Sequence, residues 1–219
     1  MNRRLLRTTY HVEIEEVTFT HGLPAWMTEG LTGSSTGTTH NYTAPYGSHY
    51  AMNAKGSVGN WATLRGTPFS TSVVKILELE AIGITLAGPA EITLGFAEPS
   101  DISTGIRLEA VPADLGVAHA GRVRLVQQVG NEVGETTLFS EGKDKHLSDS
   151  ATSMEDLDIA VIVDSEAKTS QAHLGYSYVS CGPEGFPVDQ VLAPTLKANL
   201  LADGEATVKV RKVRIGTYT

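Results

Sequence analysis

The sequence has little cysteine, little charge and few aromatic residues, and these shortages limit what the protein can be. A single cysteine, Cys181, has no partner for an internal disulfide and cannot form a cysteine-ligated zinc site. Charged residues are only 19% of the chain, below the usual share for a globular protein. The net charge of −8 offers no basic stripe for phosphate groups, so nucleic acid is not an expected partner.

Long hydrophobic runs are also missing. No stretch approaches the roughly 20 apolar residues that a membrane-spanning helix needs, so we expect no membrane insertion. The N-terminal segment MNRRLLRTTYHVEIEE begins with the basic residues of a signal peptide but lacks its apolar centre, because polar residues follow Leu5 and Leu6 directly. We therefore expect synthesis in the cytoplasm and no export by a conventional N-terminal signal.

The chain is instead rich in strand-like alternation of apolar and polar residues. Examples are SVVKILELEAIGITL, AEITLGFAE, GRVRLVQQVG, DLDIAVIVDS and EATVKVRKVRIGTYT, and turn-forming residues separate them. Helical periodicity is scarce; residues 189–201 have room for a turn or two of helix, split by Pro194. These patterns predict an all-β fold, a single antiparallel β-sandwich over 1–219 in which strands near 10–20 and 206–217 pair.

Only residues 28–60 lack this alternation, and we expect a long irregular loop there, near the N-terminus of the domain. Gly30 to Thr39 has the small polar composition of a mobile outer segment, and NYTAPYGSHY then returns along the sandwich with Tyr50 and Trp61 packed beneath it. Loops on a rigid scaffold commonly carry binding sites.

Aromatic residues are 6% of the chain, yet several of them cluster in and beside this loop. Flat rings suit stacking on sugars, and nearby amides and imidazoles suit sugar hydroxyls. Alternatively, Trp26, Tyr50 and Trp61 are core anchors that pin the loop. The candidate ligand-binding or contact residues are Asn41, Tyr42, Tyr46, His49, Asn53 and Trp61.

Catalytic and metal-binding patterns are weak. Glu78 with Glu80, and Asp156 with Asp158, have the spacing of a glycosidase carboxylate pair, but each pair is better explained as solvated acids on or beside a strand. The acidic segment 144–150 lacks the ligand pattern of a known calcium loop, and His21, His40 and His49 lack ligand spacing. We expect no catalytic residue, no metal and no cofactor.

Several segments resemble the concanavalin A-like (laminin G-like) jelly roll. They are AEITLGFAEP, TGIRLEAV, RLVQQVGNEVGETTLFS, LDIAVIVDSEAKTSQAHL and TLKANLLADGEATVKVRKVRI, within about residues 70–217. The resemblance implies a jelly-roll sandwich. The E-x-D-x-x-E signature of the glycosidases in that family is absent, because LELEAIG and MEDLDIA both depart from it.

The composition also resembles that of bacteriophage minor tail and fibre proteins, which are rich in Thr, Gly and Ala. This resemblance implies a non-enzymatic virion protein of a tail or fibre appendage that contributes to attachment to the host surface or its glycans. Its partners would be other virion proteins and further copies of itself, in a homo-oligomer that we expect to be a trimer. The alternative is a free carbohydrate-binding or glycan-cleaving jelly-roll protein.

Overall fold

The computed structural model describes residues 12–40, 47–99, 103–112, 115, 122–130, 132–138, 157–175 and 177–218. Strands and turns account for these residues, and none of the described residues belongs to a helix. Accordingly, the described part contains no helix with the length and apolar character needed to cross a membrane. The all-β prediction is confirmed.

Nine strands form the first sheet, here called sheet A, in which all neighbours run antiparallel. Its main path runs through β14 (Ser177–Cys181), β13 (Thr169–Leu174), β12 (Leu157–Asp164), β7 (Ile76–Ala87), β16 (Gly204–Val210), β4 (His49–Gly56) and β3 (Thr36–His40).

The remaining two strands of sheet A join the two ends of the chain. β17 (Lys212–Tyr218) lies beside the first half of β7, and β1 (Val12–Val17) lies outside β17 in register Val12 to Tyr218. The predicted pairing of the first and last strands is therefore confirmed. β7 pairs with β17 before Gly83 and with β16 after it, and Gly83 has the positive φ of 65° that this change of partner uses.

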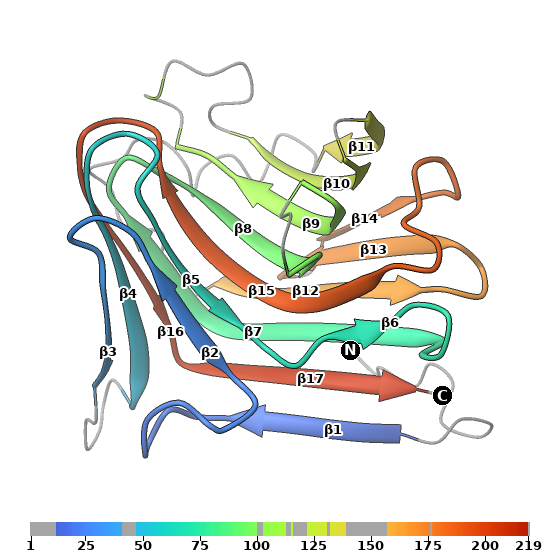
Figure 1. The fold of residues 1–219 in the computed structure, drawn as a ribbon, viewed down its shortest axis with the longest axis horizontal. Coiled ribbons are helices and arrows are strands. Elements are labelled where there is room, and N and C mark those ends of the chain that lie inside the picture. The colour runs from blue at the N-terminus through green and yellow to red at the C-terminus, as the bar shows by residue number, and fades with distance from the viewer. Residues whose placement is uncertain are drawn as a thin grey trace.

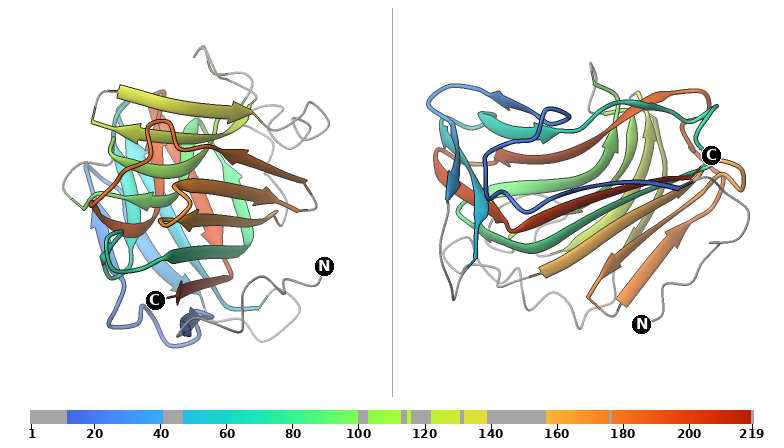
Figure 2. Two further views of the ribbon diagram at one scale, coloured as in Figure 1. Left: turned by 90° about the vertical axis from the view of Figure 1, so that its right-hand side faces the viewer. Right: turned by 90° about the horizontal axis from the view of Figure 1, so that it is seen from below.

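Eight strands form the second sheet, sheet B, which is also antiparallel throughout. Its path is β11 (Glu132–Leu138), β10 (Val123–Val129), β9 (Gly105–Ala110), β8 (Ala90–Ala97), β15 (Val191–Leu200), β5 (Trp61–Arg65) and β2 (Thr28–Leu31), with β6 (Phe69–Ser70) beside β15. The two sheets form the two layers of a jelly-roll β-sandwich (Figures 1 and 2).

One hydrophobic core fills the space between the sheets. Leu77, Leu79 and Val161 enter it from sheet A, and Leu94 and Leu108 enter it from sheet B. Successive strand residues point to opposite faces, so the alternation read from the sequence correctly separated core from surface. Leu77 and Leu79 face the core as predicted, which places Glu78 and Glu80 on the outer face.

The prediction of a helical turn within residues 189–201 is wrong, because β15 runs through the middle of sheet B. Pro194 is tolerated there because of its position in the ladder. Its carbonyl accepts a hydrogen bond from the amide of Gly66, which lies one residue past the end of β5. The N–H that proline lacks would point to the same side, beyond the last residue of β5, so no bond within that strand pair is lost.

The expected irregular loop over 28–60 is also wrong: the described part of that range forms β2, β3 and β4. The small residue at position 37 allows close packing between strands and side chains. A Cβ on Gly37 of β3 would collide with the Glu29 carboxylate and the Tyr50 hydroxyl. Tyr50 is buried beneath this strand, as predicted.

Gln127 connects the two sheets through the core. Its side chain is fully buried on the inner face of β10. Its Nε2 donates hydrogen bonds to the carbonyls of Gly182 and Glu184, at 2.8 and 3.0 Å. Its Oε1 accepts a 2.7 Å hydrogen bond from the Ser170 hydroxyl on β13. One amide thus satisfies three polar groups from the other side of the sandwich.

Replacing Gln127 with Leu should destabilise the protein by about 2–4 kcal/mol, since each buried group left without a partner costs roughly 1–3 kcal/mol. Urea unfolding measures the change. Gln171→Leu, on the outer face of β13, is the matched control and should change the free energy of unfolding by less than about 0.5 kcal/mol. Equal effects of the two substitutions would show that the buried amide does not connect the sheets.

Candidate functional site

The outer face of sheet B is unusual because its polar side chains are buried. Every residue of β9 is buried, although one face of that strand points away from the core. Arg107 and Glu109 are only 8% and 5% exposed, and Thr93 on β8 is similarly covered. β8 and β15 bend along their length (Figure 1). On this face, side chains of neighbouring strands therefore shield one another from solvent.

The strand register sets polar side chains in rows across this face. Asn199 on β15 lies between Trp61 on β5 and Glu91 on β8. The next row crosses five strands. It consists of Thr63, Lys197, Thr93, Glu109 and Arg124.

These rows surround a hollow of about 190 Å³, which we call the polar hollow. Its lining comes from strands β8, β9, β10 and β15 and from the turn before β9. The lining residues are Glu91, Thr93, Ser103, Arg107, Glu109, Gln128, Lys197 and Asn199. The lining offers carboxylate, amide, hydroxyl, guanidinium and ammonium groups, so it can both donate and accept hydrogen bonds.

The Glu109 carboxylate organises the charged side of the hollow. Its Oε1 accepts a hydrogen bond from Arg107 Nε at 2.8 Å, and its Oε2 lies 2.6 Å from Arg124 Nη2. Arg107 also donates to the Gln128 side-chain oxygen and to the Ser103 carbonyl. Each of these side chains is fixed by the next, so the hollow is held in one arrangement before any ligand enters.

Trp61 and Lys197 form the opposite side of this region. The Lys197 ammonium lies 5.5 Å from the centre of the Trp61 ring, within cation–π range. Burial lowers the pKa of Lys197; Glu91 raises it, while Arg65 and Arg107 lower it further. The Trp61 ring lies over Gly30 of β2, where a Cβ would approach the ring to 2.9 Å. Gly30 thus allows the indole to lie close to the sheet.

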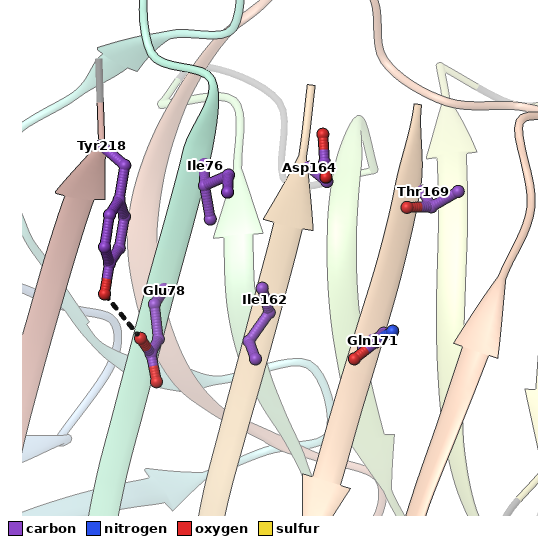
Figure 3. Close-up of a pocket in the computed structure, with 7 residues that line it drawn as sticks. All are labelled: Ile76, Glu78, Ile162, Asp164, Thr169, Gln171 and Tyr218. Atoms are coloured by element: carbon purple, nitrogen blue, oxygen red, sulfur yellow. Dashed lines mark hydrogen bonds between the residues drawn. The ribbon is translucent and has the colours of Figure 1, made fainter. Parts of the chain in front are cut away.

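A second hollow, of about 150 Å³, lies on the outer face of sheet A (Figure 3). Ile76 and Ile162 are among its lining residues, and Tyr218 donates a 3.3 Å hydrogen bond to Glu78 Oε2 (Figure 3). Asp164 also lines it, but one of its carboxylate oxygens is engaged in a turn with the Ala167 amide. This hollow has fewer fixed polar groups than the polar hollow.

Of the acids named from the sequence, Glu78, Glu80 and Asp158 are described, and none of them lines the polar hollow. Glu80 lies 3.8 Å from Arg214, while Glu78 belongs to the second hollow. Asp158 accepts a hydrogen bond from the Gly83 amide, and Asp156 lies outside the described residues, as does the acidic segment 144–150.

Two of the candidate site residues lie on sheet A. His49 stacks on His40 across the β3–β4 pair, with ring centroids 4.9 Å apart. Burial lowers the pKa of His49, and the nearby charges of His40 and Lys209 lower it further. Among the residues that the structure describes, no group of three or more His, Cys, Asp or Glu side chains could hold a metal ion.

Asn53 also lies on β4 and accepts a 2.7 Å hydrogen bond from Thr207. Of the three candidates that the structure describes, only Trp61 therefore lies on the outer face of sheet B. His49 and Asn53 are together on sheet A, away from it. Asn41, Tyr42 and Tyr46 lie outside the described residues.

The polar lining of sheet B was not predicted from the sequence. Arg107 with Glu109, and Lys197 with Asn199, show the i, i+2 spacing of side chains on one strand face, which was the available signal. That signal does not tell which strands are neighbours, so it could not reveal that these pairs meet.

No family model matches this chain, and no curated protein matches its sequence. Solved structures share its fold at low identity. The Emp47p carbohydrate recognition domain matches with a TM-score of 0.59 and 11% identity, over 94% of this chain and 95% of that one. The basic winged bean lectin, solved with Tn-antigen, matches with a TM-score of 0.58 and 6% identity, over 95% and 99%.

A phage protein shares the same fold. The CBM2 module of the evolved Dit of Lactobacillus casei BL23 phage J-1 has a TM-score of 0.60 and 8% identity, over 95% of this chain and 97% of that one. These matches establish the concanavalin A-like jelly-roll fold that the sequence segments resembled.

Glu109→Gln should destabilise the protein by about 3–5 kcal/mol, because it leaves two largely buried arginines without their carboxylate. Chemical denaturation measures the loss. The control is Glu205→Gln, which removes the exposed 2.9 Å ion pair with Lys55 and should cost less than about 1 kcal/mol. A cost at Glu109 as small as that at Glu205 would contradict the role assigned to its carboxylate.

Proposed function

We propose that this protein binds glycans without cleaving them, through the polar hollow of sheet B and the adjacent Trp61. The observation that carries the proposal is the combination of a flat aromatic ring with a hollow in which the side chains of Arg107, Glu109 and Gln128 are already fixed by one another. Trp61 lies beside Lys197 and Asn199, and both of these line the hollow. Ligand sites commonly combine an aromatic surface with a few well-placed polar groups.

The chemistry of a sugar fits this arrangement. A pyranose has C–H faces that pack on an aromatic ring, and hydroxyls that each donate and accept hydrogen bonds. Asn199 and Gln128 offer amides, and Glu91 offers a carboxylate. The Glu109–Arg107–Arg124 network holds part of the lining in place, which lowers the entropy cost of binding.

We further propose that the protein acts in a bacteriophage virion, as part of a tail or fibre appendage that attaches to the host surface. The whole-length likeness to a module of a phage Dit supports this role, together with the composition of the sequence. On this proposal its partners are other virion proteins, host glycans and further copies of itself, in a trimer. The carbohydrate-recognition neighbours support the binding function more broadly.

Trp61→Ala should weaken glycan binding by about 5- to 150-fold, because truncation of an aromatic contact residue costs on the order of 1–3 kcal/mol. Binding is measured on an array of bacterial cell-surface and plant glycans, and the melting temperature is measured alongside.

Tyr178→Ala provides the matched control, since Tyr178 is 62% exposed on edge strand β14 of sheet A. It should leave glycan binding unchanged. Absence of binding to every glycan on the array, or binding that is insensitive to Trp61, would refute the proposed site.

A further inference from the structure

We infer that the glycan bound in the polar hollow is anionic, and that Lys197 receives its carboxylate or phosphate group. This inference rests on the proposed function and adds the chemical class of the ligand. It follows from the charge of the face, from the state of Lys197 and from the position of Trp61.

The face has the opposite charge to the rest of the chain. On the outer face of sheet B, strands β5, β8, β9, β10 and β15 carry four cations and two carboxylates, which gives +2, whereas the whole chain carries −8. The cations are Arg65, Arg107, Arg124 and Lys197, and the carboxylates are Glu91 and Glu109. The charged side chains that line the hollow balance one another, so the excess positive charge comes from Arg65 and Arg124 on the surrounding face. A face of one sign in a chain of the other attracts ligands of complementary charge.

Within the described part of the chain, Lys197 is the cation of this face whose charged group makes no direct hydrogen bond or ion pair, although the Glu91 carboxylate attracts it from elsewhere in the hollow. Glu109 is occupied by Arg107 and Arg124, and Arg65 donates to the Pro99 carbonyl at 2.6 Å. Lys197 lines the hollow and is only partly exposed.

A charge in that state is costly for the folded protein. Burial disfavours the ammonium form and lowers the pKa of Lys197. Glu91 opposes this effect by attraction, while Arg65 and Arg107 add repulsion. A ligand anion would offset the burial and the repulsion, and the three N–H donors of the ammonium suit an oxyanion. A neutral sugar would supply hydroxyl oxygens but no charge.

Trp61 explains why the anion belongs to a sugar. The Lys197 ammonium lies 5.5 Å from the centre of the Trp61 ring, so one monosaccharide unit can contact both groups. A sugar ring stacked on Trp61 would thus bring its acidic substituent to Lys197. Uronic acids and glycerol-phosphate-substituted sugars share this chemistry.

The test compares acidic glycans with matched neutral ones on the wild type and two lysine variants. The probes are oligogalacturonate with its carboxyl-reduced counterpart, and glycerol-phosphate-substituted glycans with their dephosphorylated counterparts, within the same array as above. Lys197→Met removes the charge. Lys209→Met, an exposed lysine on β16 of sheet A, is the matched control.

We expect acidic members of at least one pair to bind ten or more times more tightly than their neutral counterparts, with a preference that weakens at high salt. Lys197→Met should abolish this preference and leave the melting temperature equal or higher, whereas Lys209→Met should keep the preference. The pair that shows the preference identifies carboxylate or phosphate as the group received.

The negative results separate failure of this inference from failure of the proposed function. Equal binding of acidic and neutral glycans through Trp61, or an acidic preference that survives Lys197→Met, would overturn the inference and leave glycan binding intact. Absence of binding to any glycan would overturn both.

Discussion

The register of β15 within sheet B is the constraint on which both the core and the site depend. Leu196 and Ala198 point into the core, and Lys197 and Asn199 point out to the polar face. β15 pairs with β8 on one side and with β5 on the other, so its register also aligns the side chains of those strands. A slip of one residue would exchange the two faces and bury Lys197 in the core. The apolar core therefore fixes the position of the polar hollow.

The composition of the polar hollow agrees with the proposed binding role. Arg107, Glu109 and Arg124 satisfy one another, but a buried ion-pair network of this kind contributes little net stability compared with apolar packing. Lys197 has a lowered pKa in the same region because burial disfavours its charge. A sheet face covered by apolar or small residues would be easier to fold. The charges and the indole of Trp61 make sense as pre-positioned contacts for a ligand.

The sequence predicted the architecture because alternation and turn residues are local signals. The pairing of β1 with β17 followed from them. Residues 28–60 were misread because Gly, Ser and Thr resemble linker composition, whereas Gly37 serves close contact with Glu29 and Tyr50. Of the site, only Trp61 was found. Its neighbours come from strands far apart in the chain, and the order of those strands in the sheet is not a local property.

The most direct test of glycan binding on sheet B uses the two tryptophans of the chain. Trp61 lies beside the polar hollow, whereas Trp26 packs against the hydrophobic core. Two-dimensional ¹H–¹⁵N NMR resolves their indole N–H signals during titration with the strongest binder from the glycan array. Binding at the polar hollow predicts a saturable shift of the Trp61 signal and a stationary Trp26 signal. Saturable binding that leaves the Trp61 signal in place would show that the glycan is held elsewhere.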